Sequence, residues 1–528
     1  MANISPLTRL QQLLDTLDPQ TFLQHGIERE ALRVDANGHL ARSPHPPFLG
    51  SKLCNPRITT DFSEAQLELI TPVHNSIRET LDDLKRIHQF VYGGLDDQLL
   101  WAASMPCVLN RDDQIPLADY GTSNLGHLKK TYRNGLGLRY GRAMQTICAV
   151  HYNLSLSPQS WQRLQSLEAE NTQPHQFVSD RYFDMMRNFR RFSWLLIYLF
   201  GASPALCKSF VQGRSHQLEQ FDEGTLFLEH ATSLRSGNLG YQSDLQQGLI
   251  NICYNSLSNY TRTLAQAITT EHERYRQLGL FEGSTPLQIN ACILQSEAEF
   301  YTSIRAKRTP PPGVNFLHEL RTKGVEYAEI RLLDLDPYAP LGISEEQVHF
   351  LDLYFIYCLL EESPQHCENL CQLVQENMSL AVYRGREPGL RLNNGEGEVT
   401  LKDWGLELMD ALEPLAEVLD GFFGRRQFAS SLAAQREKVE HPHLTPSARI
   451  LQDMSSHSTP FFRFAMNQSL AHKALFGNDP LAPDQQAYFE QMARDSVAQQ
   501  KEIEVSDNEP FLTYLEKVNR SYISLRED

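Results

Sequence analysis

The chain has 528 residues, enough for one large domain or two to three domains of ordinary size. Its composition, with 41% hydrophobic and 21% charged residues, excludes a disordered or low-complexity protein. The 48 lysines and arginines against 65 aspartates and glutamates give a net charge of −17, which disfavours binding to nucleic acids or anionic membranes, although a nucleotide can still bind through divalent cations.

The first two predicted elements are strands that carry acidic side chains on one face. In residues 26–34, Glu28 and Glu30 share a face because side chains alternate along a strand, and a turn signal follows. In residues 64–70, three apolar residues alternate with Glu64, Gln66 and Glu68. A helix is then predicted from the capping box Ser76–Glu79 to the glycine pair 93–94.

The middle of the chain combines strands with one very apolar helix. Residues 145–155 alternate as a strand whose polar face carries Gln145, His151, Asn153 and Ser155. Residues 192–206 are apolar but shorter than the roughly 20 residues that cross a bilayer, so they predict a buried helix that ends near Gly201. Residues 287–294 predict a further apolar strand.

The last predicted elements lead from a strand into a helical region. Residues 309–313 are rich in proline and predict a surface loop, and residues 325–333 alternate so that Glu329 and Arg331 share a face. Ser344–Gln347 is a second capping box, which opens a helix that is apolar on most sides. From about Asp403 onward, the pattern is helical throughout.

The polar faces of these strands favour a metal site. An ordinary amphipathic sheet with one face in water explains any single strand, but a solvated face normally mixes lysine with glutamate, and lysine is absent from these faces. We therefore expect an internal, concave sheet whose oxygen-rich ligand set selects Mg²⁺ or Mn²⁺. The candidate ligands are Glu28, Glu30, Asp61, Glu64, Glu68, His151 and Glu329.

Glycine-rich phosphate loops are missing from the sequence. The segment 121–126 has nearly the spacing of a P-loop, but His127 stands where the lysine must be. A nucleotide would therefore have to be held by cations and basic side chains. Basic residues cluster in 129–142, where a solvated helix face is an equally good interpretation, and others are Arg235, Arg305, Lys307, Arg308 and Arg331.

The cysteines and the N-terminus indicate a cytoplasmic protein. The nine cysteines are odd in number and lie in apolar segments, as is typical of reduced thiols. His366, Cys367 and Cys371 lack a second group of ligands at metal-binding spacing. The first residues have no basic region followed by a continuous apolar run, so no signal peptide is predicted.

Several motifs together resemble one family. The segment GIEREALRV at 26–34 and the segments that follow it in order are similar to the proteobacterial class of glutamate–cysteine ligase. The other segments are 58–72, 104–107, 120–126, 132–133, 140–153, 199–204, 231–235, 239–241, 288–290, 301–308, 324–331 and 444–451. The tail beyond about residue 452 resembles the family only in being helical and acidic.

This resemblance implies an α+β fold and an ATP-dependent ligase. The fold would be a curved, mainly antiparallel sheet, a glutamine-synthetase-like saddle or half-barrel surrounded by many helices. The chain 1–528 would form a single large catalytic domain, with a mostly helical C-terminal part at roughly 403–528 packed on it. The reaction would join the γ-carboxylate of L-glutamate to the amine of L-cysteine through γ-glutamyl phosphate, as the first step of glutathione biosynthesis, with Mg²⁺ or Mn²⁺ as cofactor and ATP as co-substrate.

The resemblance also implies residue roles. Its metal ligands would be Glu28, Glu30, Asp61, Glu68, His151 and Glu329. Catalysis would involve Arg331, Arg235 and Glu329, and nucleotide binding Arg331, Arg305 and Lys307. Substrate-binding residues would be Tyr132, Arg133, Gln145, Asn153, Arg235, Tyr241 and Tyr301. Some members of the class carry a second cysteine near 160–170 that this sequence lacks, so Cys107 is expected to be a buried structural thiol.

Two other functions stay open at this point. One is a different carboxylate–amine ligase on the same scaffold, since a sheet of cation ligands cannot distinguish between amines. The other is a catalytically silent ligand-binding relative, which the loss of a metal carboxylate would support. The class further implies a monomer, with feedback inhibition by glutathione as an expected property.

Overall fold

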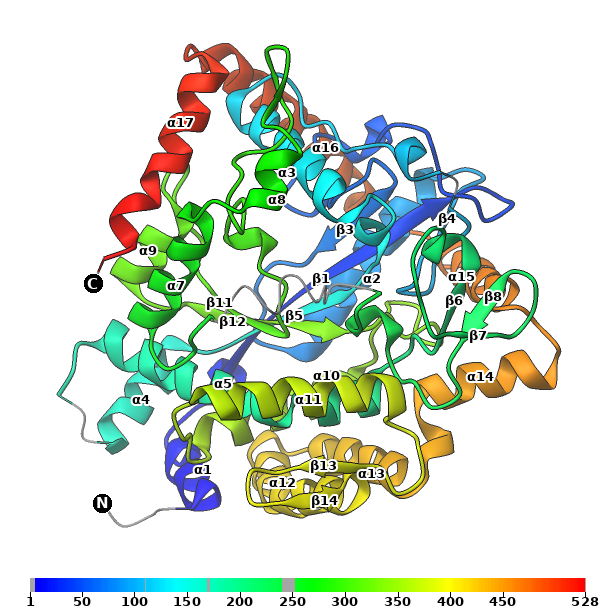
Figure 1. Ribbon diagram of the computed structural model, residues 1–528. Coiled ribbons are helices and arrows are strands. Elements are labelled where there is room, and N and C mark those ends of the chain that lie inside the picture. The colour runs from blue at the N-terminus through cyan, green and yellow to red at the C-terminus, as the bar shows by residue number, and fades with distance from the viewer. Residues whose placement is uncertain (1–4, 110, 169–170, 240–251, 528) are drawn as a thin grey trace.

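The computed structural model describes residues 5–109, 111–168, 171–239 and 252–527 (Figure 1). Its centre is a seven-stranded sheet in the order β11–β12–β5–β1–β3–β2, with β4 paired to one end of β1. Every pair of strands in it is antiparallel. The strands are β1 (Leu23–Val34), β2 (Ile58–Thr60), β3 (Gln66–Ile70), β4 (Leu99–Leu100), β5 (Val150–Leu156), β11 (Ile304–Lys307) and β12 (Tyr327–Leu333).

Three small sheets and many helices surround this centre, which confirms the expected α+β class. The small sheets contain β6 (Ala205–Cys207), β7 (Glu219–Gln220) and β8 (Thr225–Phe227), then β9 (Phe281–Glu282) and β10 (Thr285–Pro286), then β13 (Arg391–Asn393) and β14 (Glu398–Thr400). The helices up to the middle of the chain are α1 (Pro6–Leu14), α2 (Ile77–Gly94), α3 (Asn124–Tyr140), α4 (Pro158–Glu168), α5 (Pro174–Phe200), α7 (Leu257–Thr269), α8 (Glu273–Gln277) and α9 (Phe316–Lys323).

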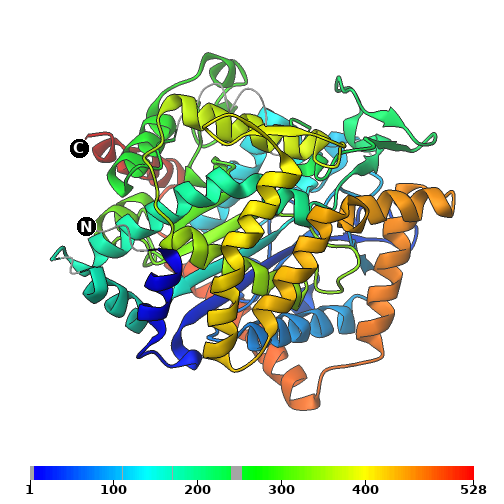
Figure 2. The same cartoon turned by 90° about the horizontal axis from the view of Figure 1, so that it is seen from below.

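The rest of the chain is almost entirely helical, as its pattern predicts. Its helices are α10 (Glu345–Leu360), α11 (Glu368–Arg384), α12 (Leu401–Phe423), α13 (Gln427–Glu440), α14 (Pro446–Ser456), α15 (Phe461–Gly477), α16 (Pro483–Ser506) and α17 (Phe511–Ser521). Both halves of the capping box at Ser344 are formed, and α10 is buried along nearly its whole length. Seen from below, α12 and α13 lie in front of the sheet (Figure 2), and α10 packs against both of them.

The two faces of the sheet have different surroundings. Helix α2 packs on β1 and β3 and helix α5 on β11 and β12, so one face is covered by helices. On that face, His25 of β1 reaches Asp352 of α10 at 2.9 Å. Because side chains alternate along β1, Glu28 and Glu30 point to the opposite face. That face is where α3 and the segment 287–301 lie, and it holds the candidate site.

One sequence prediction of a strand was wrong in part and another was wrong throughout. The strand predicted at 145–155 begins only at Val150, because residues 144–146 form a 3₁₀ turn in which the Thr146 hydroxyl donates to the carbonyl of Ala143 at 2.7 Å. Residues 287–294 form no strand. This segment has hydrogen bonds to a side chain where a strand would have bonds to a neighbouring strand. Arg139 donates both to the carbonyl of Asn290 and to the side chain of Gln288.

The remaining predictions concern the apolar helix and the cysteines. The apolar segment is the end of α5, whose last turn closes at Gly201. No helix in the described ranges is long and apolar enough to span a bilayer. All nine cysteines are free, and burial raises the pKa of Cys107 well above its ordinary value, as expected for a structural thiol.

Candidate active site

The register of the central strands brings the acidic residues together. Glu28 on β1 is paired with His151 on β5, and Glu30 is paired with Glu68 on β3. On the other side of β5, Asn153 is paired with Glu329 of β12, which in turn is paired with Arg305 of β11. Antiparallel pairing places directly opposed side chains on the same face. Residues separated by 300 positions in the sequence therefore share one surface.

Glu28, Glu68 and His151 have the geometry of a metal centre. One ligand atom from each lies within 4.8 Å of the others. His151 Nδ1 is 3.3 Å from Glu28 Oε2, and its Nε2 is 3.7 Å from Glu30 Oε1. The amide of Asn153 donates to the second oxygen of Glu28 at 2.9 Å, which fixes that carboxylate. This donor set of carboxylates and one imidazole suits a hard divalent cation.

The protonation of these carboxylates is consistent with a cation site. Burial, with the negative charges of Asp61 and Glu68, raises the pKa of Glu30 well above its ordinary value. Burial, with the charges of Glu28 and Asp61, raises the pKa of Glu68 to about 8. With every carboxylate ionised, the cluster would hold more negative charge than its surroundings neutralise, and a divalent cation would supply the missing positive charge.

Glu329 belongs to the cationic side of the site. Burial opposes its ionisation, but Lys307 at 3.4 Å and Arg331 at 3.2 Å hold its pKa well below the ordinary value. Arg331 Nη1 also lies 3.5 Å from His151 Nδ1. Burial and the charge of Arg331 together lower the pKa of His151, which favours the neutral imidazole that can bind a metal.

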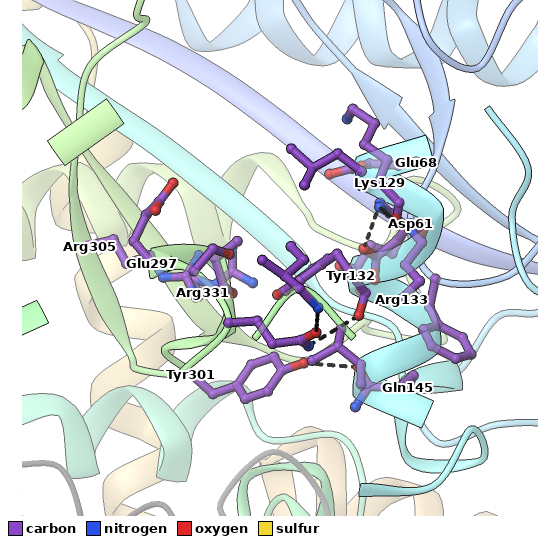
Figure 3. A pocket seen from close by; sticks show the side chains of 18 of the residues that line it. Asp61, Glu68, Lys129, Tyr132, Arg133, Gln145, Glu297, Tyr301, Arg305 and Arg331 are labelled. Atoms are coloured by element: carbon purple, nitrogen blue, oxygen red, sulfur yellow. Dashed lines mark hydrogen bonds and ion pairs between the residues drawn. The ribbon is translucent and has the colours of Figure 1, made fainter. Parts of the chain in front are cut away.

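A cavity of about 370 Å³ opens beside this cluster. Figure 3 shows Asp61, Glu68, Lys129 and Arg133 on one side of it and Tyr301, Arg305, Arg331 and Glu297 on the other. The expected residues that line it are Glu30, Asp61, Glu68, Tyr132, Arg133, Gln145, His151, Tyr301, Arg305 and Arg331. A smaller cavity of about 50 Å³ shares His151, Tyr301 and Arg331 with it and is lined by Arg235.

One wall of the larger cavity is formed by aromatic and amide groups. The hydroxyl of Tyr301 donates to Gln145 Oε1 at 2.9 Å. Arg133 on α3 donates to the backbone carbonyl of Asp61, and its guanidinium lies over the ring of Tyr120 at 4.6 Å. These contacts hold Arg133 at the edge of the cavity, close to the acidic strands.

Several of the expected residues have a structural partner or lie off the cavity. Arg235 forms an ion pair with buried Asp334 at 2.6 Å, and Arg305 donates to the carbonyls of Ala298 and Phe300. Asn153 and Lys307 act through Glu28 and Glu329 rather than lining either cavity. Tyr241 lies outside the described residues.

Glu64 is not part of the metal cluster. Its two oxygens accept bonds from Lys52 at 2.6 Å and from the backbone N–H groups of Asp119 at 2.8 Å and His45 at 2.7 Å. Protein donors therefore saturate this carboxylate, which stabilises the loop before β3. The sequence prediction of Glu64 as a ligand was wrong.

The cavity also contains residues that the sequence did not assign. Lys129 lines it, and burial together with Arg133 lowers the pKa of this lysine to about 8. Its place in the basic segment 129–142 was the signal that could have identified it. Glu297, Val518 and Tyr522 also line the cavity, and the sequence offers no pattern that assigns them to it.

Comparison with known proteins decides the family. The family model described as "Glutamate-cysteine ligase" matches residues 10–381. The chain belongs to the glutamate–cysteine ligase family. Proteins named glutamate–cysteine ligase from Pseudomonas fluorescens (strain Pf0-1) and Alcanivorax borkumensis are each 45% identical to it, over 95% and 93% of this chain and 94% and 95% of theirs.

Solved structures agree with membership of the glutamate–cysteine ligase family. The chain is similar to the glutamate–cysteine ligase of Francisella tularensis, solved in complex with AMP, with a TM-score of 0.89 and 34% identity over 96% of this chain and 99% of that one. A bifunctional glutathione synthetase from Pasteurella multocida, at 23% identity and a TM-score of 0.69, shares the fold over 92% of this chain and 57% of its own.

Proposed function

We propose that this member of the glutamate–cysteine ligase family joins the γ-carboxylate of L-glutamate to the amine of L-cysteine at the expense of ATP, giving γ-glutamylcysteine, ADP and phosphate. The observation that carries the proposal is the acidic cluster on β1, β3 and β5, which lines a cavity of about 370 Å³ together with Arg331. Amide formation from a free carboxylate in water is unfavourable, so the carboxylate is first converted to γ-glutamyl phosphate. This step fits the site, because it needs charge compensation around a transferring phosphoryl group.

Mg²⁺ or Mn²⁺ is the proposed cofactor, held by Glu28, Glu30, Asp61, Glu68, His151 and Glu329. When bound, such an ion neutralises the phosphates of ATP and the charge that develops during phosphoryl transfer. The fit rests on the donor set, since buried carboxylates with raised pKa values are those that a divalent cation would stabilise in the ionised form.

The cationic side chains would bind the two anionic substrates. Arg331 lines both cavities, and its guanidinium would contact the transferring phosphoryl group. Arg235 lines the smaller cavity, where it would bind the glutamate carboxylates. Lys307 and Arg305 would help Arg331 to bind the nucleotide. Lys307 would orient Glu329, with which it forms an ion pair. Arg305 would hold the turn that carries Glu297.

The second amino acid would bind in the larger cavity. Tyr132, Gln145 and Tyr301 would form the wall around its thiol, with Asn153 supporting the site through Glu28 and with Tyr241 as a further expected wall residue. Arg133 would contact its carboxylate. We further propose a cytoplasmic, monomeric, single-domain enzyme that glutathione inhibits and that acts on small molecules.

One assay tests this function against its alternatives. Phosphate release from Mg-ATP is measured with glutamate, with and without cysteine, 2-aminobutyrate or other amino acids. Stimulation by cysteine above the other amines supports the proposal. A greater stimulation by a different amine would identify another ligase of the same fold, and no release under any condition would indicate a non-catalytic relative.

Arg133→Ala should raise the KM for cysteine far more than the KM for ATP. Loss of one partner of a buried charged contact typically costs about 2–5 kcal/mol, which is on the order of 30- to 4,000-fold. Because phosphorylation of glutamate precedes attack by the amine, slow ADP release without cysteine should persist. Lys130→Ala is the matched control, since Lys130 lies on the same helix with its side chain 48% exposed. If both KM values rose together and the background reaction vanished, Arg133 would belong to the nucleotide site.

Metal affinity should increase with pH. The pKa of Glu68 is raised from 4.5 to about 8 in the folded, metal-free protein, so the stability that its protonation confers is present below pH 4.5 and is lost as the pH rises through 8. A cation must displace that proton, so its affinity should rise up to ~10-fold per pH unit between pH 6 and 7. Calorimetry in buffers of different ionisation enthalpy measures the proton release. An affinity independent of pH, without proton release, would contradict this. Glu68→Gln should reduce the dependence, and Glu30, whose pKa is also raised, should account for what remains.

A further inference from the structure

The C-terminal segment of the chain forms part of the wall of the substrate cavity. Val518 on α17 and Tyr522, directly after that helix, both line the cavity, together with Lys129 and Tyr132 of α3. Helix α17 packs against α3, on the side away from α10 and α12 (Figure 1). The family model ends at residue 381, so this wall lies outside the part of the chain that it matches.

Specific hydrogen bonds fix this wall in place. The hydroxyl of Tyr522, a residue only 5% exposed, donates to Glu297 Oε2 at 2.7 Å. Asn519, the residue after Val518, makes two further bonds. Its amide donates to the carbonyl of Ile289 and its side-chain oxygen accepts from the amide of Asn290, each at 3.1 Å. The position of α17 is therefore set by the segment 289–297, whose Ile289 and Glu297 also line the cavity.

The same region also holds the start of α3. The carboxylate of Asp507, in the connection between α16 and α17, accepts bonds from the backbone N–H and the side-chain amide of Asn124 at 2.5 and 2.6 Å. Because α3 carries Tyr132 and Arg133, the C-terminal segment positions two sides of the cavity at once. Such anchoring lets the C-terminal segment act as a fixed wall that defines the shape of the cavity.

The cavity has an apolar as well as a charged lining. Its apolar lining residues are Phe62, Leu128, Leu136, Ile289, Ala298 and Val518. Next to apolar side chains, a ligand with one more methylene binds only if the cavity wall leaves room for that group. The valine side chain at 518 and the ring at 522 limit that space on the side of α17.

We propose that Val518 and Tyr522 determine the size of the amine substrate, Val518 by contact with its side chain and Tyr522 as a positioning residue that holds Glu297 at the cavity wall. The proposal rests on the proposed function and deepens it. The ligand class is an α-amino acid with a short, weakly polar side chain, and longer side chains are excluded by the C-terminal wall.

The first experiment compares amine substrates. In Val518→Ala, the ratio of kcat/KM for homocysteine to kcat/KM for cysteine should rise about tenfold, since one methylene in an apolar pocket is worth about 10–200-fold in selectivity. The KM for ATP and the thermal midpoint should change little. Val505→Ala is the matched control, because Val505 is 82% exposed on the preceding helix α16. An unchanged ratio in Val518→Ala, or an equal change in Val505→Ala, overturns the proposal.

The second experiment isolates the hydroxyl of Tyr522. Tyr522→Phe keeps the ring and removes the hydroxyl with its bond to Glu297, so the KM for cysteine should rise several-fold while kcat and the KM for ATP stay near wild type. The effects of Tyr522→Phe and Glu297→Gln should not add in the double variant, as is expected of two residues acting through one contact. Additive effects, or a loss of kcat and stability without a change in KM, would overturn the role of Tyr522.

Failure of this proposal is distinguishable from failure of the proposed function. If the wild-type enzyme prefers an amine other than cysteine, the proposed function fails, but the selectivity ratio between that amine and its one-carbon-longer homologue still tests Val518. If the wild-type enzyme uses cysteine and the ratio does not respond to Val518→Ala, the function stands and the role of the C-terminal wall is rejected.

Discussion

Glu28→Gln should reduce cysteine-dependent ADP formation by about 100-fold or more, even at high Mg²⁺. The substitution nearly preserves volume but replaces a charged oxygen ligand by an amide. Even outer-shell partners of a metal typically contribute about 10- to 100-fold in affinity or activity, and Glu28 lies directly in the cluster with Glu68 and His151. Steady-state ADP release with glutamate, ATP and cysteine over a range of Mg²⁺ concentrations measures the effect.

Folding must survive for this result to be informative. The thermal midpoint of Glu28→Gln should stay close to that of the wild type, because an amide can still accept from Asn153. Glu326→Gln is a suitable control, since Glu326 is exposed just before β12, away from the cluster. Glu329→Gln should behave like Glu28→Gln. Normal turnover of both site variants at limiting Mg²⁺ would reject these residues as ligands.

Arg331→Ala should lower kcat by about 1,000-fold, the lower end of the effect of arginines that stabilise phosphoryl transfer. Arg331 is the lining residue whose guanidinium contacts both Glu329 at 3.2 Å and His151 at 3.5 Å. Its removal would also take away one of the positive charges that stabilise the ionised form of Glu329, so the pKa of that carboxylate should rise. Single-turnover formation of ADP separates the chemical step from product release.

A graded series makes the role of Arg331 specific. Arg331→Lys keeps the charge but loses the planar pair of donors, so it should recover only part of the lost rate. Arg391→Ala serves as the control, because Arg391 lies on β13 with its side chain 55% exposed. If Arg331→Ala had a normal kcat and raised only the KM for cysteine, Arg331 would be assigned to the amine pocket and not to the phosphoryl site.

Strand patterns predicted the centre of this fold well. The segments 26–34 and 325–333 correspond to β1 and β12. In β12, Glu329 and Arg331 alternate with the apolar Ala328, Ile330 and Leu332, whereas β1 also buries Arg29 and Arg33 on the face opposite Glu28 and Glu30. The absence of lysine from those faces distinguished an internal surface from a solvated one. The same reasoning failed at 287–294, where Arg139 bonds the segment that the pattern assigned to a strand.

The site could be predicted only as far as it lies on strands. Register follows from side-chain alternation, so the convergence of Glu28, Glu68 and His151 was accessible from the sequence. The ion pair of Arg235 with Asp334 was not, since it joins a 3₁₀ turn to the end of a strand through tertiary packing. The cavity residues Val518 and Tyr522 were missed because nothing local links a helix near residue 520 to strands before residue 160.

The use of the last helix as a wall has a consequence for synthesis. A ribosome that adds about 5–20 residues per second releases β12 well before α17, so the acidic sheet can pair while the cavity is still open on one side. A chain that terminates early, before Val518, would carry the whole acidic cluster without the wall that Tyr522 and Val518 provide. Translation beyond Tyr522 is therefore required to complete this wall of the cavity.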